Sequence, residues 1–316
     1  MDVFSHFVLP YLVVYALTGR RHVALAAGIG GVAPDLDALT AVVSLWDPLY
    51  FLGHRGVSHS LLGAPLYALG AVLLLRAPFW RRVLPIHEEL RFGGGLTLVA
   101  LAFSYTHLLL DGLTHWGVPL LYPWSPQRFS AGWFFYSVTL MIPVSAWVVW
   151  RTARGTDTRR GRRLALALLV GILLLAGSVR AATYPRDEAY DVVYPSATEW
   201  SWNALDRTEE GWNATFYAWG RPVGSVEYLE PPVRDPEALF ALARAREHVE
   251  HKAFLLYTKG PHVAQVEPRV EGGWNVTFLD LMERAQADRA PWFPLADKAG
   301  KLRFAVLDDG RVLELD

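Results

Sequence analysis

Residues 105–117 read YTHLLLDGLTHWG and place three ionisable side chains in a stretch apolar enough to lie in a membrane. These side chains are His107, Asp111 and His115, spaced four residues apart. An α-helix advances about 100° per residue, so positions i, i+4 and i+8 share one face. Imidazole and carboxylate groups on one stripe can bind a divalent cation. Because ionisable groups inside a hydrophobic helix are costly unless they pair, bind a metal or meet water, the stretch predicts a functional site in a membrane helix.

The composition indicates a membrane protein with a second, water-soluble part. The 316 residues are 52% hydrophobic with a mean hydropathy of +0.19, which is too apolar for an ordinary soluble protein. Apolar residues are concentrated in 1–182, whereas 183–316 mix charged residues with Trp, Gly and Pro. We therefore expect an all-α polytopic membrane domain of about four to six hydrophobic helices over 1–182, followed by a small extracytoplasmic α+β domain over 183–316.

Several classes of site are excluded or disfavoured by composition. The chain has no cysteine, which excludes thiolate metal ligands, disulfides and cysteine nucleophiles. The net charge of -1 and the absence of a basic stripe argue against a nucleic-acid partner. The N-terminus lacks a basic region and a small-residue cleavage site, so we expect it to be part of the mature protein.

Hydrophobic runs predict the membrane segments. The run at 23–33 is too short to span a bilayer alone, so 7–33 is predicted to form a short helix with a re-entrant or tightly bent partner. The runs are 7–18, 23–33, 60–76, 94–114, 131–150 and 163–182.

Arginines predict the orientation of these segments. Six arginines lie between residues 151 and 163 and four between residues 76 and 91. Because basic residues near helix ends stay on the cytoplasmic side, both loops should be cytoplasmic. Alternation then places residues 34–59, 115–130 and everything after 183 on the outer side, together with the histidines and aspartates that could bind a metal.

The sequence PDLD at residues 34–37 supplies two further carboxylates. Proline favours a break or a new helix start. Asp35 and Asp37 could then bind a metal or orient a ligating histidine. Alternatively, either aspartate could cap a helix.

The block GHRGVSHS at residues 53–60 adds two histidines and an arginine. His59 could bind a metal, and His54 could bind a metal or move a proton. Arg55 could hold an anionic oxygen through two hydrogen bonds, or it could face lipid headgroups. Ser58 or Ser60 could have the alternative role of a helix N-cap.

Together these blocks resemble the YdjM-like group of membrane-bound, metal-dependent hydrolases. That group has an early histidine, a PDxD turn, an HRGxSHS block and an HxxxDxxTH helix, which here are His6, Pro34–Asp37, His54–Ser60 and His107–His115. The match covers about residues 1–150. The group is distantly similar to zinc-dependent phospholipase C and related zinc nucleases, which are all-helical. The resemblance implies phosphoester hydrolysis.

The same residues can be assigned roles in metal-assisted hydrolysis of a lipid or cell-envelope phosphoester. A divalent metal, zinc in preference to others and one to three ions, would promote the ionisation of water. His54 would bind the metal or protonate the leaving oxygen, and Arg55 would offset the charge on the phosphate. The expected ligands are His59, His107, Asp111, Asp35 and Asp37, followed by His6 and His115.

Two alternatives remain beside hydrolysis by a metal. A non-catalytic membrane protein could use the cluster to carry or sense cations, or as a structural metal site. The nearly uncharged inner halves of the helices favour a one-sided site over a transport path, and Arg55 favours catalysis. A serine hydrolase using Ser58 with His59 has little support, because adjacent side chains rarely point together and no G-x-S-x-G turn is present.

Residues 183–316 contain a short repeated motif, WNATF at 212–216 and WNVTF at 274–278. In both copies large apolar residues alternate with polar ones, which predicts a half-buried strand. A helix is predicted over 236–250, and DDG at 308–310 predicts a hairpin turn. The tail also resembles family members in which a proline precedes a tryptophan-containing strand, here Pro195 and Trp200 or Trp202. Further strands are predicted at 223–229, 253–258, 262–267, 302–307 and 311–315.

Overall fold

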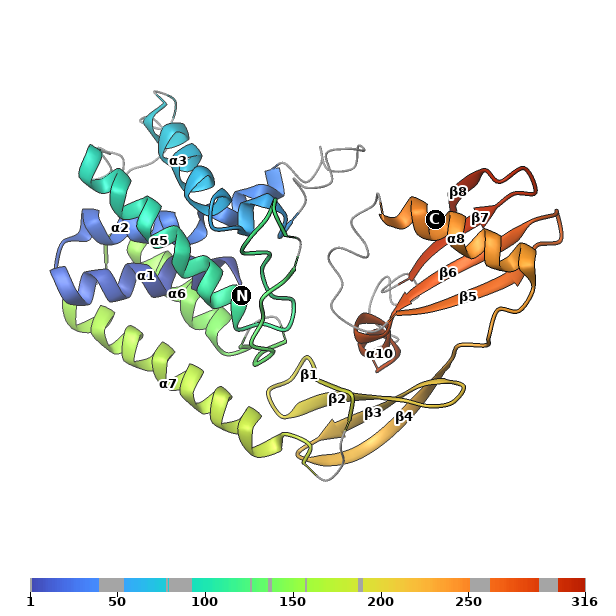
Figure 1. Ribbon diagram of the computed structural model, residues 1–316. Helices are drawn as coiled ribbons and strands as arrows, with labels where there is room; N and C mark the ends of the chain where they lie inside the picture. Colours follow the sequence, from blue (N-terminus) through green and yellow to red (C-terminus); the bar gives the residue numbers. More distant parts are fainter. Residues whose placement is uncertain are drawn as a thin grey trace. The chain divides into compact units, whose positions relative to one another are not determined.

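The computed structural model divides the chain into two compact units, Met1–Val179 and Arg180–Asp316 (Figure 1). The first unit is helical and the second is built on β-sheets. The residues that the structure describes are 2–39, 54–77, 79, 93–125, 127–135, 138–156, 158–186, 190–250, 262–289 and 301–315.

Helices form at each of the predicted apolar runs. Among the described residues, two helices are long and apolar enough to cross a membrane: α5, with 19 residues and a mean hydropathy of 1.2, and α7, with 25 residues and a mean hydropathy of 2.3. The apolar helices α1 and α3 are shorter. The helices are α1 (Val3–Thr18), α2 (Arg21–Val32), α3 (Gly63–Arg76), α5 (Gly94–Gly112), α6 (Met141–Ala153) and α7 (Arg159–Thr183), with 3-10 turns η1 (Ala33–Leu39) and η4 (Val57–His59).

Small residues bring the first helices into close contact. Gly19 ends α1 with φ +67°, a backbone conformation that glycine adopts without strain, and the chain turns directly into α2. Gly30 of α2 lies against α5, where an added Cβ would be 2.1 Å from the carbonyl oxygen of Ala100. The contact between α2 and α5 is therefore backbone to backbone, and it brings the end of α2 beside α5.

The predicted span at 131–150 is wrong in its first half. The helix in this region is Met141–Ala153, and its 13 residues are fewer than a bilayer span needs. Residues before it instead pair with the segment after α5, where Trp133 N–H donates to the Leu113 carbonyl and His115 N–H donates to the Phe134 carbonyl. Pro143 fits the first turn of a helix, which favours a start at Met141.

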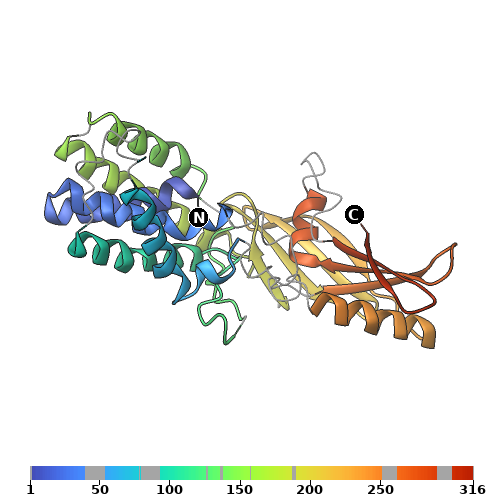
Figure 2. The ribbon, with the colours of Figure 1, turned by 90° about the horizontal axis from the view of Figure 1, so that it is seen from above.

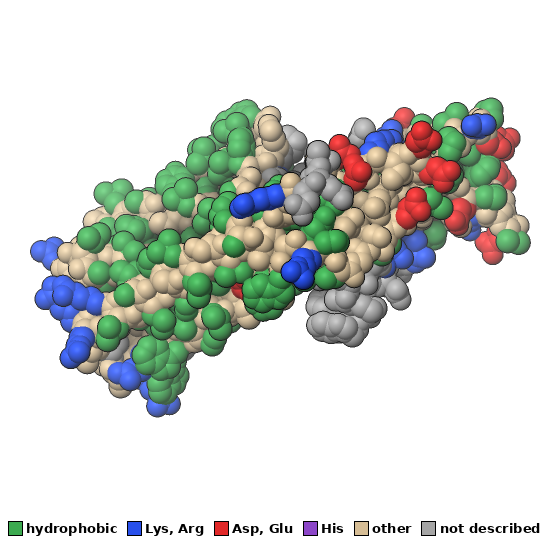
Figure 3. All heavy atoms as spheres, turned by 90° about the horizontal axis from the view of Figure 1, so that it is seen from below, with side chains coloured by type: hydrophobic (Ala, Val, Ile, Leu, Met, Phe, Trp, Pro, Cys, Tyr) green, Lys and Arg blue, Asp and Glu red, His purple; other side chains and the backbone are tan. Residues whose placement is uncertain are grey.

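The helical unit carries much apolar surface (Figure 3). Helix α7 buries Ala165, Leu169 and Ala176 and exposes its leucines on the other side. Such extended apolar surface is typical of a protein that faces lipid or a partner. Leucines at least half exposed include Leu66, Leu73, Leu98, Leu109, Leu168 and Leu174.

The described residues of the second unit form two four-stranded antiparallel sheets with strand orders β1-β2-β3-β4 and β5-β6-β7-β8. Helix α8 packs on strands β5, β6 and β7 (Figure 2). The elements are β1 (Val192–Pro195), β2 (Ser201–Arg207), β3 (Gly211–Ala218), β4 (Arg221–Leu229), α8 (Pro236–Glu250), β5 (His262–Pro268), β6 (Trp274–Asp280), α10 (Leu281–Arg289), β7 (Lys301–Val306) and β8 (Val312–Leu315).

Most predicted elements of this unit are present. The repeated pentapeptides form β3 and β6, in which Ala214, Phe216, Val276 and Phe278 are buried, as the alternation predicts. The predicted strand at 253–258 lies outside the described residues. Strands β1 and β2 and helix α10 have no counterpart among the predictions from residue patterns. Trp202, named through the resemblance to family members, lies in β2.

Candidate metal centre

Four separate segments bring the predicted site residues together in the helical unit. The start of α1 supplies His6, and η1 follows α2 directly with the PDLD residues. The block ending in η4 supplies His59, and the last turns of α5 supply His107 and Asp111. The side chains of His6, His59, His107 and Asp111 are at most 1% exposed.

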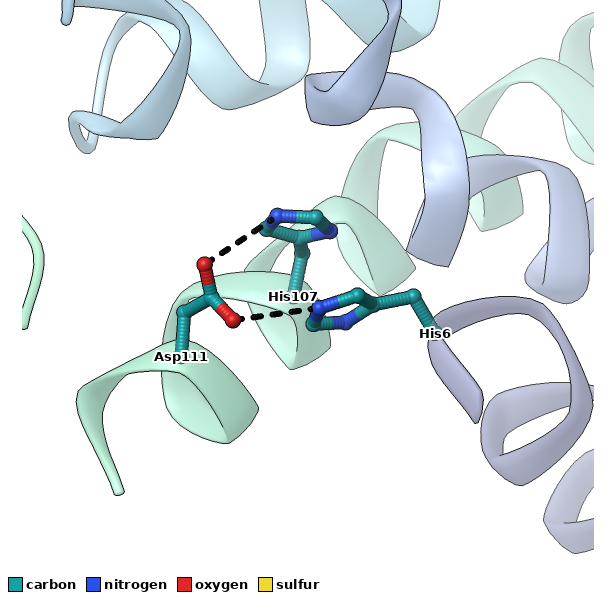
Figure 4. A group of neighbouring side chains, drawn as sticks. All are labelled: His6, His107 and Asp111. Atoms are coloured by element: carbon teal, nitrogen blue, oxygen red, sulfur yellow. Dashed lines mark hydrogen bonds and ion pairs between the residues drawn. The ribbon is translucent and has the colours of Figure 1, made fainter. Parts of the chain in front are cut away.

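One group consists of His6, His107 and Asp111, whose ligand-type atoms lie within 4.8 Å of one another (Figure 4). His6 Nε2 lies 3.1 Å from Asp111 Oδ1, and His107 Nε2 lies 3.8 Å from Asp111 Oδ2. The rings of His6 and His107 stack with their centres 3.7 Å apart. Thus the carboxylate faces two parallel imidazoles.

A second group, Asp35, His54 and His59, meets the same distance limit. It adjoins the first, because His59 Nε2 lies 3.0 Å from His107 Nε2. Asp35 Oδ1 lies 3.5 Å from His107 Nε2 and 3.9 Å from His59 Nε2. The two groups therefore form one continuous cluster, which we call the His/Asp cluster.

The hydrogen bonds around His107 and His59 determine which ring nitrogens carry protons. His107 Nδ1 lies 2.8 Å from the Gly31 carbonyl oxygen, which only accepts, so Nδ1 donates. Ser58 gives its one proton to Asp37 Oδ2 at 2.6 Å, so the contact of 2.8 Å between His59 Nδ1 and Ser58 Oγ needs a proton from His59.

Both histidines therefore present the other nitrogen, Nε2, as a lone pair when the rings are neutral. Two lone pairs 3.0 Å apart repel unless a positive charge lies between them, either a proton or a metal cation. Histidines that bind metals ordinarily donate their second ring N–H to a carbonyl or carboxylate in this way.

Asp37 lies behind the cluster. Its Oδ2 accepts hydrogen bonds from Ser58 Oγ and the Arg55 N–H, and it lies 3.3 Å from His59 Nδ1. Its Oδ1 lies 3.0 Å from His54 Nδ1. Burial raises the pKa of Asp37, but the hydrogen bonds from His54 and His59 outweigh burial and hold this pKa well below its usual range. The sequence leaves three roles open for Asp37, as a metal ligand, as a carboxylate that orients a histidine or as a helix cap. This geometry matches the orientation of histidines, and within the described residues Asp37 is in neither of the two groups.

Arg55 contacts the cluster through its guanidinium. Nη2 lies 3.0 Å from Asp111 Oδ2, and Nη1 donates to Thr114 Oγ1 at 3.1 Å and to the Gly117 carbonyl at 3.4 Å. The side chain is buried and the backbone adopts φ +62°, which is uncommon for a residue other than glycine. Such backbone strain persists where the surrounding contacts fix it.

His115 does not share the helical stripe, contrary to the prediction, because α5 ends at Gly112. The chain after Gly112 turns into the segment that pairs with Phe134. His115 Nδ1 donates to the Phe135 carbonyl at 2.6 Å, and its ring stacks on that of Phe135. Within the described residues, His115 is in neither of the two groups.

Three contacts around the cluster lie outside the expectations from the sequence. Adjacent Ser58 and His59 do point together, although such pairs were expected to diverge. The sequence suggests a helix cap or a nucleophile at Ser58, whereas in the structure Ser58 links His59 to Asp37. The Gly31 carbonyl was also missed, because no sequence pattern marks a backbone acceptor.

The donor set fits a divalent metal of the borderline type. Imidazole nitrogens and carboxylate oxygens are the ligands that suit zinc and similar cations. His6 Nδ1 is buried and has no hydrogen-bond partner among the described residues, whereas Nε2 of the neutral ring donates to Asp111 Oδ1 at 3.1 Å, because a carboxylate only accepts. A cation bound by His6 Nε2 and Asp111 Oδ1 would take the place of that proton.

One side of the cluster is accessible. The side chain of His54 is 48% exposed and that of Asp35 is 12% exposed, whereas the other members are almost completely buried. Burial raises the pKa of Asp35. Access from this side would admit water or a substrate group.

The helical unit matches a known protein family. A family model described as YdjM inner membrane protein matches residues 1–183, which extends the resemblance beyond the expected 1–150. No curated protein and no solved structure matches the chain. Because the family model covers more than half of the chain, the protein belongs to the YdjM inner membrane protein family and is a membrane protein.

Proposed function

We propose that this protein is a metal-dependent hydrolase of the membrane, which cleaves a phosphoester of a lipid or cell-envelope component. The observation that carries the proposal is the pair of Nε2 atoms of His59 and His107, which face each other at 3.0 Å while the opposite ring nitrogens donate hydrogen bonds. This arrangement prepares both rings to bind a cation, for which zinc is our first choice.

The proposed ligands are His59, His107 and Asp111, with His6 and Asp35 completing the set. When bound, a divalent cation supplies Lewis-acid chemistry and promotes the ionisation of water near neutral pH. The protein's own contribution is to hold the imidazoles and carboxylates in fixed orientations.

Arg55 and His54 have different proposed roles. Arg55 contacts Asp111, so it positions this carboxylate and offsets its charge; that contact supports positioning more directly than a contact with substrate. His54 is the exposed member and lies 3.0 Å from Asp37, which makes it the group best placed to deliver a proton to a leaving oxygen.

The orientation of the helices supports a one-sided site. His6 lies near the start of α1, whereas Arg20 follows its end. His107 lies near the end of α5, whereas Thr97 in its first turns accepts a hydrogen bond from Arg76. Arg20 and Arg76 thus lie at the ends of these helices opposite to the His/Asp cluster. By the positive-inside rule we propose that the cluster and the C-terminal unit are extracytoplasmic.

A non-catalytic metal site is the second candidate, because most of the cluster is buried. A structural metal is closed to solvent, whereas a catalytic one keeps a position for water or substrate. The partial exposure of Asp35 and His54 favours the open site.

The proposal is tested by hydrolysis assays on the full-length protein in detergent. The protein is stripped with a chelator, reloaded with zinc and assayed with bis-p-nitrophenyl phosphate, p-nitrophenyl phosphate and extracted envelope lipids. We expect hydrolysis of at least one substrate to depend on zinc and to be lost in His107→Ala. His22→Ala is the control, because His22 is exposed on α2. Metal binding without hydrolysis of any substrate would favour the structural or sensing alternative.

A further inference from the structure

A pocket of about 70 Å³ lies between α6 and the beginning of α7. Trp147 and Arg151 of α6 line one wall, and Arg162 and Ala165 of α7 line the other, with Thr158 just before α7. Since a single water needs only about 10–15 Å³ of such space, the pocket can take a polar group larger than water.

The surroundings of the pocket are strongly basic. Residues 151–163 contain six arginines and one aspartate. Arg21, which begins α2, reaches the same region and donates to the Thr152 carbonyl at 3.0 Å. In Figure 3 the Lys and Arg side chains gather at this end of the helical unit. Among the described residues that line the pocket there is no carboxylate.

Aromatic rings hold the two arginines of the pocket. The Arg162 guanidinium is 3.8 Å from the centre of the Tyr15 ring, and the whole side chain is 6% exposed. The Arg151 guanidinium is 5.6 Å from the Trp147 ring, and its Nη2 donates to the Thr156 carbonyl at 2.5 Å. Cation–π contacts of this kind fix a cation without neutralising its charge. Two positive groups are therefore held on opposite walls of the pocket.

Apolar surface continues from the pocket along α7. Trp147 is 51% exposed, and Leu164 and Leu168 on the outer side of α7 are 61% and 52% exposed. This helix is apolar enough to cross a membrane. A ligand that combines an anionic group with an apolar chain would match both features, whereas a free anion would use only the arginines.

We propose that this pocket binds the phosphate of an anionic phospholipid between Arg151 and Arg162, with an acyl chain along Leu164 and Leu168. Basic pockets between membrane helices are suited to anionic headgroups, because each arginine near the bilayer surface contributes attraction and donates hydrogen bonds to phosphate. The site is separate from the His/Asp cluster and does not depend on hydrolase activity.

The proposal is tested by native mass spectrometry of the full-length protein in a neutral detergent. Phosphatidylglycerol and phosphatidylcholine with identical acyl chains are titrated in parallel. We expect phosphatidylglycerol to bind more tightly than phosphatidylcholine. Arg151→Gln should weaken the binding of phosphatidylglycerol about fivefold, which is the effect of one arginine at a membrane surface. Arg160→Gln is the matched control, because Arg160 is exposed in the same basic segment and does not line the pocket.

Three outcomes would overturn the proposal. Equal binding of the two lipids would exclude a site for an anionic headgroup. Equal weakening by Arg151→Gln and Arg160→Gln would indicate diffuse attraction to the basic segment. Displacement of phosphatidylglycerol by millimolar inorganic phosphate would show that the site takes a free anion. Arg162→Gln is a second test, used if its gel-filtration profile and helicity equal those of the wild type, and it should weaken phosphatidylglycerol at least as much as Arg151→Gln.

Discussion

Replacing Asp37 by asparagine tests whether the carboxylate behind the cluster controls metal affinity. The substitution keeps the shape of the side chain and removes its charge. Three donors surround Oδ2, namely the Arg55 N–H, Ser58 Oγ and His59 Nδ1. The amide oxygen of asparagine can still take this position, which leaves the amide NH₂ beside His54 Nδ1, a nitrogen that can accept when neutral.

We therefore expect the substitution to change metal affinity through the lost charge and not through a change of shape. Without the negative charge behind Ser58 and His59, the His59 imidazole becomes a weaker base and a weaker ligand. Loss of such an orienting partner typically lowers metal affinity about 10–100-fold, or roughly 1.4–2.7 kcal/mol. Asp37→Ala would be less informative, because it leaves several buried donors unsatisfied, each at a cost of about 1–3 kcal/mol in folding.

The assay is competition for zinc with a chromophoric chelator, using detergent-purified protein. Asp206→Asn, an exposed aspartate on β2, controls for the loss of one negative charge. A zinc affinity of Asp37→Asn within twofold of the wild type, with unchanged helicity, would refute the assigned role of Asp37.

Three further predictions concern folding. Gly30→Ala should disturb the packing of α2 on α5 and lower stability by about 1–3 kcal/mol, because the new Cβ would lie 2.1 Å from the Ala100 carbonyl oxygen; thermal unfolding should show no comparable loss for Gly70→Ala, where nothing lies within 4 Å. Burial raises the pKa of Asp280 to about 6 against an ordinary 3.8, so its contribution to stability is full below about pH 4 and is lost as the pH rises through 6. The whole pKa shift corresponds to roughly 3 kcal/mol of stability, of which roughly 2 kcal/mol is lost between pH 4.5 and pH 7. Hydrogen exchange of β6 and α10 should therefore show greater protection at pH 4.5 than at pH 7, and Asp280→Asn should remove this difference. Arg180→Met should lower the free energy of local opening of β2 by roughly 3 kcal/mol, because Arg180 donates to the carbonyls of Ser196 and Ser201. Hydrogen exchange of β2 measures this change. The control Arg186→Met, which changes an exposed arginine, should leave hydrogen exchange of β2 unchanged.

The period of the apolar residues and the residues that begin or end elements explain which parts of the fold were predictable. The strands β3 and β6 follow from the alternation in WNATF and WNVTF, and α8 follows from an apolar face that begins after a proline. Helix α10 was missed because it follows β6 without a break. Its start is marked only by Asp280, whose carboxylate accepts from the Met282 and Glu283 N–H groups.

In the site, too, residue spacing within one helix was predictable, whereas contacts between distant segments were not. The spacing of His107 and Asp111 correctly placed both on one helical face, because both lie within α5. The same spacing failed for His115, since nothing in a four-residue period marks the end of the helix at Gly112. The contacts of Ser58 with Asp37 and of the Gly31 carbonyl with His107 join residues that are far apart in the chain, and a single sequence does not encode them as a pattern.

The central claim is that the His/Asp cluster binds a metal, and the most direct test is the metal content of the purified full-length protein. Elemental analysis after gel filtration should find at least one divalent metal ion per chain, zinc by our proposal. His59→Ala and His107→Ala should lose this metal, whereas the control His22→Ala should retain it. A wild-type protein without stoichiometric metal after incubation with zinc, or variants that keep the full metal content, would contradict the claim.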